Sequence, residues 1–276
     1  MIVWQADFYR VPKQDAAAQP LWQLLMCDRT LSFTYEATCP QSEVSANWLI
    51  EQLQKTGLPD IIQVFRPQTL NLLATAGQQL GIKVEATRRT TALKQWLQAR
   101  SSLEPGYNPL AIDKPPPLPL PEKLWGEAWR FATLPAGDLV DAFASRPIPI
   151  LEMPEFMHPI ALGLRSTIPV PGVIIDGGRQ SMKLARWIKN VRPVALNYIS
   201  GAPDGLILEA GLVDRWVMVT FEDADVAAAG KAFQQRLQSQ TRGLHFLLVQ
   251  PDNSGMTYSG FWLLRDENWE LGIENC

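Results

Sequence analysis

One segment of the chain concentrates side chains that can bind a polyanion. Residues 176–192 read DGGRQSMKLARWIKNVR and are predicted to form a helix from about residue 179. No acidic residue occurs between residues 180 and 203. At 3.6 residues per turn, five cations follow one face of that helix and its edge, and a row of this kind suits a phosphate backbone. We call this set the basic stripe: Arg179, Lys183, Arg186, Lys189 and Arg192.

The rest of this segment predicts how the helix is placed. Its apolar residues, such as Leu184 and Ile188, fall on the opposite face and are expected to dock on a sheet. Gly177 and Gly178 precede the helix, where free backbone amides can form a nest for an anion. The alternative is a solvated amphipathic helix without a ligand. Asp-Gly-Gly matches neither of the common glycine-rich nucleotide motifs, so no nucleotide cofactor is predicted.

A second group of cations lies in the first half of the chain. It comprises Arg66, Lys83, Arg88, Arg89, Lys94 and Arg100, and Trp96 stands among them. Three of these are predicted to bind RNA, with Trp96 as an aromatic platform for a base: Arg88, Arg89 and Lys94. An exposed helix face with Trp96 in the core is the other interpretation.

Carboxylates raise the alternative of a metal-dependent nuclease, which needs several Asp or Glu residues around two metal ions. Asp7 lies on the first predicted strand, and Glu43 or Glu51 can approach from the first helix. However, Gln63 and Arg66 stand where a further carboxylate is expected. Acidic residues of the second half are predicted to be turn and cap residues. Without a Cys/His cluster, no metal site is predicted.

The order of predicted elements defines the fold class. Residues 1–107 read as β-β-β-α-β-α-β-α, an α/β domain that we predict to be ribonuclease-H-like. The prolines of residues 108–121 predict a semi-rigid linker. Residues 122–276 form a second α/β domain. Its residues 218–251 read as a strand, a helix and a strand that ends in proline, and they parallel residues 33–67, which predicts a second, related β-β-β-α-β module with a mixed sheet.

Bulk properties set limits on the function. The 276 residues carry a formal net charge of −3, so a nucleic-acid site must be a local patch. No stretch approaches 18 apolar residues, which predicts no transmembrane segment. The start of the chain lacks the pattern of a signal or transit peptide, and three scattered cysteines favour a reducing compartment.

A set of ordered segments resembles one protein family along nearly the whole chain. The segments are WQADFYR, LWQLLMCD, LPEKLWGEAWRFATLPAGDL, RPIPI, DGLILEAGLVDRWVMVTFED, VAAAGKAFQQR, GLHFLLVQPD and SGMTYSGFWLLRD. They are similar to the TAB/ATAB proteins of oxygenic phototrophs. The resemblance implies a non-catalytic protein that binds single-stranded, A/U-rich 5′ untranslated regions and promotes translation of photosystem I core-subunit messages. Implied partners are RNA and the ribosome or thylakoid-associated translation machinery.

The resemblance also brings a family motif, the tripeptide Trp262-Leu263-Leu264. Alternate strand residues face opposite sides, so Leu263 is expected on one face and Trp262 with Leu264 on the other. A strand that is apolar on both faces is usually buried, although contact of Trp262 with RNA is the other interpretation. Lacking a transit peptide, the chain resembles a bacterial form that acts in the cytoplasm, at the periphery of thylakoids. A photosystem assembly scaffold that binds only proteins remains a further alternative.

Overall fold

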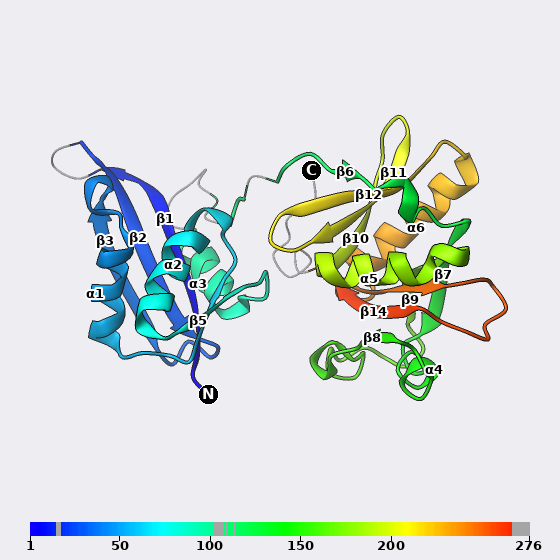
Figure 1. The fold of residues 1–276 in the computed structure, drawn as a ribbon, viewed down its shortest axis with the longest axis horizontal. Helices are drawn as coiled ribbons and strands as arrows, with labels where there is room; N and C mark the ends of the chain where they lie inside the picture. Colours follow the sequence, from blue (N-terminus) through cyan, green and yellow to red (C-terminus); the bar gives the residue numbers. More distant parts are fainter. Residues whose placement is uncertain (15–17, 102–107, 109, 113, 267–276) are drawn as a thin grey trace. The chain divides into compact units, whose positions relative to one another are not determined.

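The computed structural model describes residues 1–14, 18–101, 108, 110–112 and 114–266 (Figure 1). The chain divides into two compact units, Met1–Asp113 and Lys114–Cys276, each of which has its own core. Among the described residues, no helix is long and apolar enough to cross a membrane.

The N-terminal unit is built on one mixed sheet. Its strands lie in the order β3-β2-β1-β4-β5, with β1, β2 and β3 antiparallel and β4 and β5 parallel to β1. The elements are β1 (Val3–Gln14), β2 (Pro20–Asp28), β3 (Thr34–Pro40), η1 (Gln41–Glu43), α1 (Ala46–Thr56), β4 (Ile61–Val64), α2 (Pro67–Leu80), β5 (Lys83–Ala86) and α3 (Thr91–Ser101). The predicted order of strands and α-helices is therefore confirmed, and the assignment to the ribonuclease-H-like class stays a prediction.

Local chemistry explains where these helices begin and end. The Ser45 hydroxyl accepts a hydrogen bond from the Trp48 amide and caps α1. Pro67 begins α2, where the missing amide proton costs nothing. Gly81 ends α2 in the left-handed conformation, with φ of 71°.

The N-terminal sheet is covered on both faces. Helices α1 and α2 pack on one face through side chains such as Leu49 and Leu73. Helix α3 packs on the other face, where Leu93 and Leu97 contact a smaller cluster around Phe65. Each face of β1 is therefore buried, which places Asp7 inside the unit.

The boundary between the units falls within the predicted linker of residues 108–121. The division lies between Asp113 and Lys114. Leu118–Pro119 form a short strand, β6, which pairs parallel with Trp216 and Val217 of β12. Leu120 is buried in the C-terminal core. The second half of the proline-rich segment thus belongs to the C-terminal unit, and the linker itself stays a prediction.

The C-terminal unit contains two mixed sheets, with the orders β10-β11-β12-β6 and β7-β9-β13-β14-β8. Its remaining elements are η2 (Glu122–Leu124), β7 (Ala128–Pro135), α4 (Asp141–Ala144), β8 (Ile150–Glu152), η3 (Glu155–Met157), β9 (Pro169–Asp176), η4 (Gly178–Gln180), α5 (Ser181–Val191), β10 (Pro193–Ile199), β11 (Asp204–Ala210), β12 (Asp214–Phe221), α6 (Ala224–Ser239), β13 (Leu244–Gln250) and β14 (Gly260–Arg265).

The prediction of a second, related module is wrong in its sheet topology. The order β10-β11-β12-α6-β13 exists, but β13 pairs with β9 and β14 in the other sheet. In the N-terminal unit the corresponding strand, β4, pairs with β1 of the same sheet. The cause is β9, a strand that lies before β10 in the chain and takes the place beside β13.

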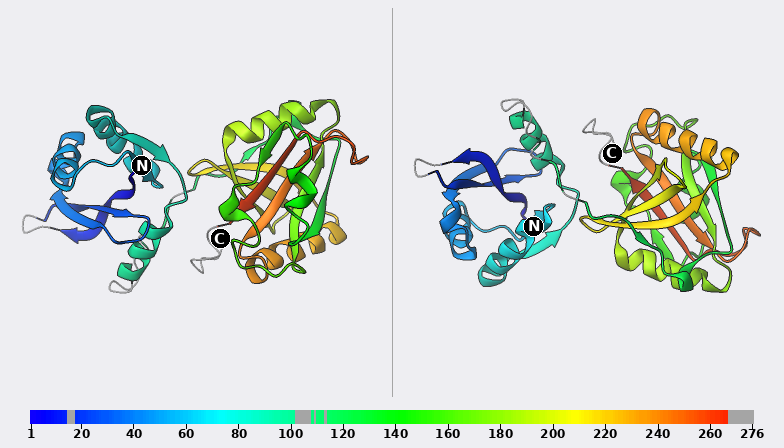
Figure 2. Two further views of the ribbon diagram at one scale, coloured as in Figure 1. Left: turned by 90° about the horizontal axis from the view of Figure 1, so that it is seen from below. Right: turned by 90° about the horizontal axis from the view of Figure 1, so that it is seen from above.

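The five-stranded sheet of the C-terminal unit is covered on both faces. One face carries α5, α6 and the four-stranded sheet, which share a single core. Figure 2 shows α5 and α6 on either side of the β11–β12 strands. The other face is covered by the segment between β7 and β9, through residues such as Leu139 and Phe143. Strand β14 lies inside this sheet, between β13 and β8.

Candidate nucleic-acid interface

Helix α5 separates its buried and charged sides as the sequence predicts. Ser181, Leu184, Ala185 and Ile188 are buried. The basic stripe lies on the outside, and all five of its members are exposed. Lys183, Arg186 and Lys189 belong to α5 itself, Arg179 lies in the preceding η4 turn, and Arg192 follows the last helical residue with φ of 58°.

The charges of the basic stripe are not neutralised within the described part of the chain. None of its five members forms an ion pair or side-chain hydrogen bond with the described residues. The nearest acid before the helix, Asp176, is instead held by Arg130, with Nη1 to Oδ2 at 2.6 Å, and by Gln250, with Nε2 to Oδ1 at 2.7 Å. The stripe therefore presents an uncompensated positive field at the surface.

The predicted anion nest before this helix is wrong. The Gly177 amide donates to the Gln250 carbonyl at 2.8 Å, and the Gly178 amide donates to the Pro251 carbonyl at 2.9 Å. Gly178 has φ of 52°, and the Glu127 carboxylate occupies the space where its side chain would project. These two glycines anchor the turn to the end of β13, and their amides are not available to a ligand.

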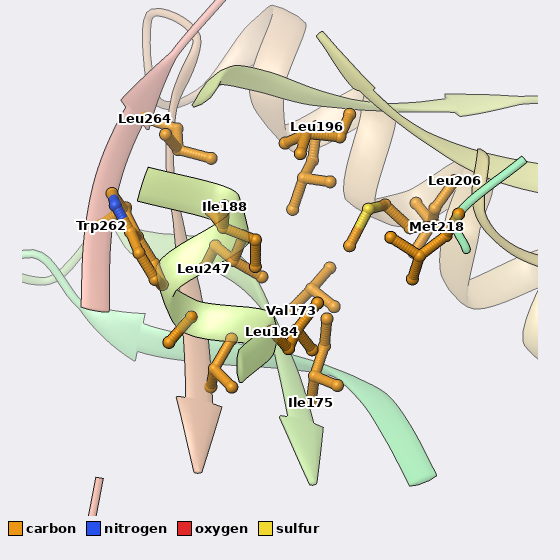
Figure 3. Packing of buried hydrophobic residues seen from close by; sticks show 14 of the residues in the cluster. Val173, Ile175, Leu184, Ile188, Leu196, Leu206, Met218, Leu247, Trp262 and Leu264 are labelled. Carbon is orange, nitrogen blue, oxygen red and sulfur yellow. The ribbon is translucent and has the colours of Figure 1, made fainter. Parts of the chain in front are cut away.

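The buried face of α5 packs against residues of the family motif. Trp262 lies in the same core as Leu184, Ala185 and Ile188, and Figure 3 shows its indole against the helix. A Cβ placed on Gly260 would meet Trp262 Cη2 at 2.3 Å and Ala185 Cβ at 3.2 Å. The missing side chain of Gly260 therefore gives the indole and the helix room to pack together.

All three residues of the family motif are core residues. Trp262 is 1% exposed and Leu264 2%, and both face the core below α5. Leu263 is also 2% exposed but packs on the opposite face with Phe261. The predicted alternation of faces is confirmed. The buried position of Trp262 contradicts the interpretation in which its indole contacts RNA.

The second predicted RNA-binding group is engaged in contacts within the N-terminal unit. Lys94 donates a short hydrogen bond to the Arg88 carbonyl and lies 5.7 Å from the centre of the Phe65 ring. Arg88 and Lys94 are partly buried, while Arg89 is exposed. Arg100 pairs with Glu36 at 2.7 Å and lies over Trp96, which packs on the α3 core. This group is thus less accessible than the basic stripe.

The carboxylate that suggested a nuclease is neutralised by an arginine. Asp7 is fully buried, and the Arg66 guanidinium contacts both of its oxygens, with Nε to Oδ1 and Nη2 to Oδ2 both at 2.9 Å. Burial raises the pKa of the Asp7 carboxyl, and the charge and hydrogen bonds of Arg66 oppose this. The predicted approach of Glu43 or Glu51 has no counterpart among the described contacts of Asp7.

The other acidic side chains do not assemble a metal centre in the described part of the chain. No group of three His, Cys, Asp or Glu residues there is placed to hold a metal ion. Asp223 caps α6 by accepting from the amides of Asp225 and Val226, as predicted for a cap residue. Asp204 accepts from the Gly201 amide and the Tyr198 hydroxyl in a turn.

Comparison with known proteins decides the family. The model of the RNA-binding protein Tab2/Atab2 C-terminal domain matches residues 107–265, and that of the Tab2/Atab2 N-terminal domain matches residues 3–100. The chain belongs to the Tab2/Atab2 family. The resemblance identified in the sequence is therefore confirmed, and with it an RNA-binding family.

Two curated relatives in plants span nearly all of the chain. One is a chloroplastic TAB2 homolog of Zea mays, 29% identical over 95% of this chain and 71% of its own length. The other is a chloroplastic TAB2 homolog of Arabidopsis thaliana, 27% identical over 95% of this chain and 74% of its own length.

The matched solved structures are distant. The HTLV-2 integrase catalytic core domain with magnesium, in a dimeric form, is 16% identical over 40% of this chain and 76% of its own, with a TM-score of 0.26. A trimeric form of the same domain is 13% identical with the same coverage and a TM-score of 0.24. With TM-scores this low, these structures do not bear on the fold or function of the Tab2/Atab2 chain.

Proposed function

We propose that this protein binds single-stranded RNA through the basic stripe of α5 and has no catalytic activity of its own. The observation that carries the proposal is the row of five exposed cations without an ion pair among the described residues. Phosphates that replace counterions along such a row bind with a favourable entropy of ion release. The family, whose members are described as RNA-binding proteins, supports the same conclusion.

The packing of the buried face of α5 supports this assignment. An RNA surface needs cations whose positions relative to one another are fixed. Helix α5 is held in place by four buried residues and by the Trp262 indole beneath it. We assign the family motif to this supporting role. Arg88, Arg89 and Lys94 form a weaker candidate surface, since their unit uses several of its cations internally.

The absence of catalysis is part of the proposal, and the Asp7–Arg66 pair supports it. A carboxylate that is fully buried and pairs through both oxygens with a guanidinium is already neutralised, and a metal ion would have to displace that cation. A ribonuclease-H-like N-terminal unit would then be a scaffold without the chemistry of a nuclease. RNA degradation that depends on Mg²⁺ or Mn²⁺ and disappears in Asp7→Asn would refute this.

We further propose that the RNA is the A/U-rich 5′ untranslated region of photosystem I core-subunit messages, and that binding promotes their translation in the cytoplasm beside thylakoids. The plant relatives are chloroplastic, which places them in a photosynthetic organelle. The ribosome or thylakoid-associated translation machinery would be the further partner.

A binding titration with intact full-length protein tests this proposal. Labelled A/U-rich and G/C-rich single strands of equal length are titrated at several salt concentrations, with and without magnesium. We expect tighter binding of the A/U-rich strand, affinity that falls steeply with salt, and RNA that stays intact. A photosystem assembly scaffold that binds only proteins would show no RNA affinity even at low salt.

A further inference from the structure

A pocket in the C-terminal unit has α5, the helix that carries the basic stripe, as one of its walls. It has a volume of about 400 Å³, within the range of sites that hold small organic groups. Strands β6 and β12, the segment that leads into β7, and α5 all line it. Its walls are mostly apolar, and the residues that matter here are Trp125, Ala128, Trp129, Leu184, Met218 and Thr220.

Two tryptophans give the pocket an aromatic wall. Trp125 is 58% exposed, which is unusual for the largest side chain. Its Nε1 donates a hydrogen bond to the Leu120 carbonyl at 2.9 Å, and this bond fixes the orientation of the exposed ring. Trp129 is partly buried and packs on Phe221 at a centroid distance of 5.3 Å. Rigid, partly exposed indoles are suitable platforms for stacking bases.

Strand pairing between β11 and β12 is irregular at one residue that lines the pocket. Leu206 of β11 pairs with Val219, and the next residue, Ile207, pairs with Val217. Met218 is therefore an extra residue in β12, a β-bulge that lines the pocket. Bulges interrupt strand pairing and re-aim side chains, and they are over-represented next to functional sites.

Charge next to the pocket selects the class of ligand. Leu184 forms part of its wall, and the neighbouring residue in α5, Lys183, is an exposed member of the basic stripe. The residues that line the pocket carry no carboxylate. Glu127, which lies in the chain between the lining residues Gly126 and Ala128, reaches Gly178 at the beginning of η4, so an anionic strand is favoured over the middle of α5.

We propose that this pocket holds an unstacked nucleobase of the RNA strand whose phosphates contact Lys183 and Arg186. The proposal rests on the proposed function and deepens it, because it adds a base-binding subsite to a phosphate-binding face. Stacking on Trp125 supplies affinity that does not depend on salt, while the basic stripe supplies the part that does. A small, mostly apolar pocket of this kind accepts one base and excludes duplex RNA, whose bases are stacked.

The test compares full-length variants on oligouridine of roughly twelve nucleotides, within the site sizes of single-strand-binding proteins, and on an abasic strand of equal length. Trp125→Ala should weaken oligouridine binding about 5- to 150-fold, the equivalent of one stacked base. It should leave the salt slope and the affinity for the abasic strand unchanged. Trp125→Phe should recover most of the lost affinity, and Phe156→Ala, which removes another exposed aromatic residue of this unit, should change nothing.

A second variant guards against an effect of Trp125→Ala on folding. Ala128 is exposed and lines the pocket, so Ala128→Trp should fill it without removing a charge and lower oligouridine affinity in the same way. Equal losses on abasic RNA, or unchanged oligouridine affinity in both variants, would overturn the pocket assignment. The pocket assignment would also be overturned if Trp125→Ala abolished self-association or peptide binding while RNA affinity stayed unchanged. If variants of the basic stripe also bind normally, the proposed function fails as well.

Discussion

Trp262 of β14 and Ala185 of α5 meet over Gly260, each within 3.2 Å of the point where a Cβ of that glycine would lie. The family motif and the basic stripe are therefore two sides of one packing arrangement. One side is a buried indole in the middle of a sheet, and the other is a helix that carries cations on its outer face. The motif packs against the buried face of α5 and is not itself part of the proposed RNA surface.

Replacement of Trp262 by alanine should destabilise the protein without removing an RNA contact. The loss of this buried indole should lower the free energy of unfolding by about 3–5 kcal/mol. Leu263→Ala is the matched control, since Leu263 is equally buried on the opposite face. Urea denaturation measures both effects. At a temperature where each variant is folded, both should bind RNA within a few-fold of the wild type. Lost affinity in folded Trp262→Ala alone would assign the motif to the RNA site.

Arg66→Met should be strongly destabilising. It leaves the fully buried Asp7 carboxylate without the guanidinium that contacts both oxygens. Breaking a buried ion pair from one side costs about 3–5 kcal/mol, while replacing both members with apolar residues costs less. The double variant Asp7→Leu, Arg66→Met should therefore be more stable than Arg66→Met alone, as measured by thermal or urea unfolding. A single variant as stable as the wild type would show that the pair contributes nothing.

His245 should make the C-terminal unit sensitive to acid. Its Nε2 accepts a hydrogen bond from the Leu196 amide at 2.8 Å, so its proton lies on Nδ1, which donates to the Gly243 carbonyl. Burial lowers the pKa of His245 to about 4. Between pH 6.5 and pH 4 the unfolded chain binds a proton that the folded chain does not, so this contribution to stability is complete above pH 6.5 and is lost as pH falls.

The matched variant for this prediction is His245→Gln, which retains an acceptor for the Leu196 amide but does not titrate. Between pH 7 and pH 5 the wild type should lose about 2 kcal/mol more unfolding free energy than the variant. Urea denaturation at the two pH values measures the difference. Equal losses in both proteins would show that His245 is not responsible.

Local signals in the sequence account for the beginning of α1 and for both ends of α2. The cap at Ser45, the proline that begins α2 and the glycine that ends it all lie within one turn of the feature they determine. The phase of α5 was predicted in the same way, because helical periodicity fixes which residues share a face. The exposure of the basic stripe followed directly from that periodicity.

Long-range pairing was not predictable from one sequence. The apolar residues of β13 suit a central strand but do not specify β9 as its neighbour. The amides of Gly177 and Gly178 bond to carbonyls more than 70 residues away, so the expected nest was not free. The pocket at Trp125 requires β6 to pair with β12, and no local pattern indicates that a proline-rich segment does so.

The measurement that tests the account most directly is RNA affinity as a function of salt for the variant Arg179→Ala, Lys183→Ala, Arg186→Ala, Lys189→Ala. The matched control removes four exposed cations outside α5: Arg29, Lys55, Arg165 and Lys231. For single strands each lost phosphate contact flattens the slope of log K against log salt by about 0.7. We predict a slope flatter by up to about 3 for the α5 variant, weaker binding of all sequences alike, and little change in melting temperature. An α5 variant with the affinity and slope of the control would contradict the account.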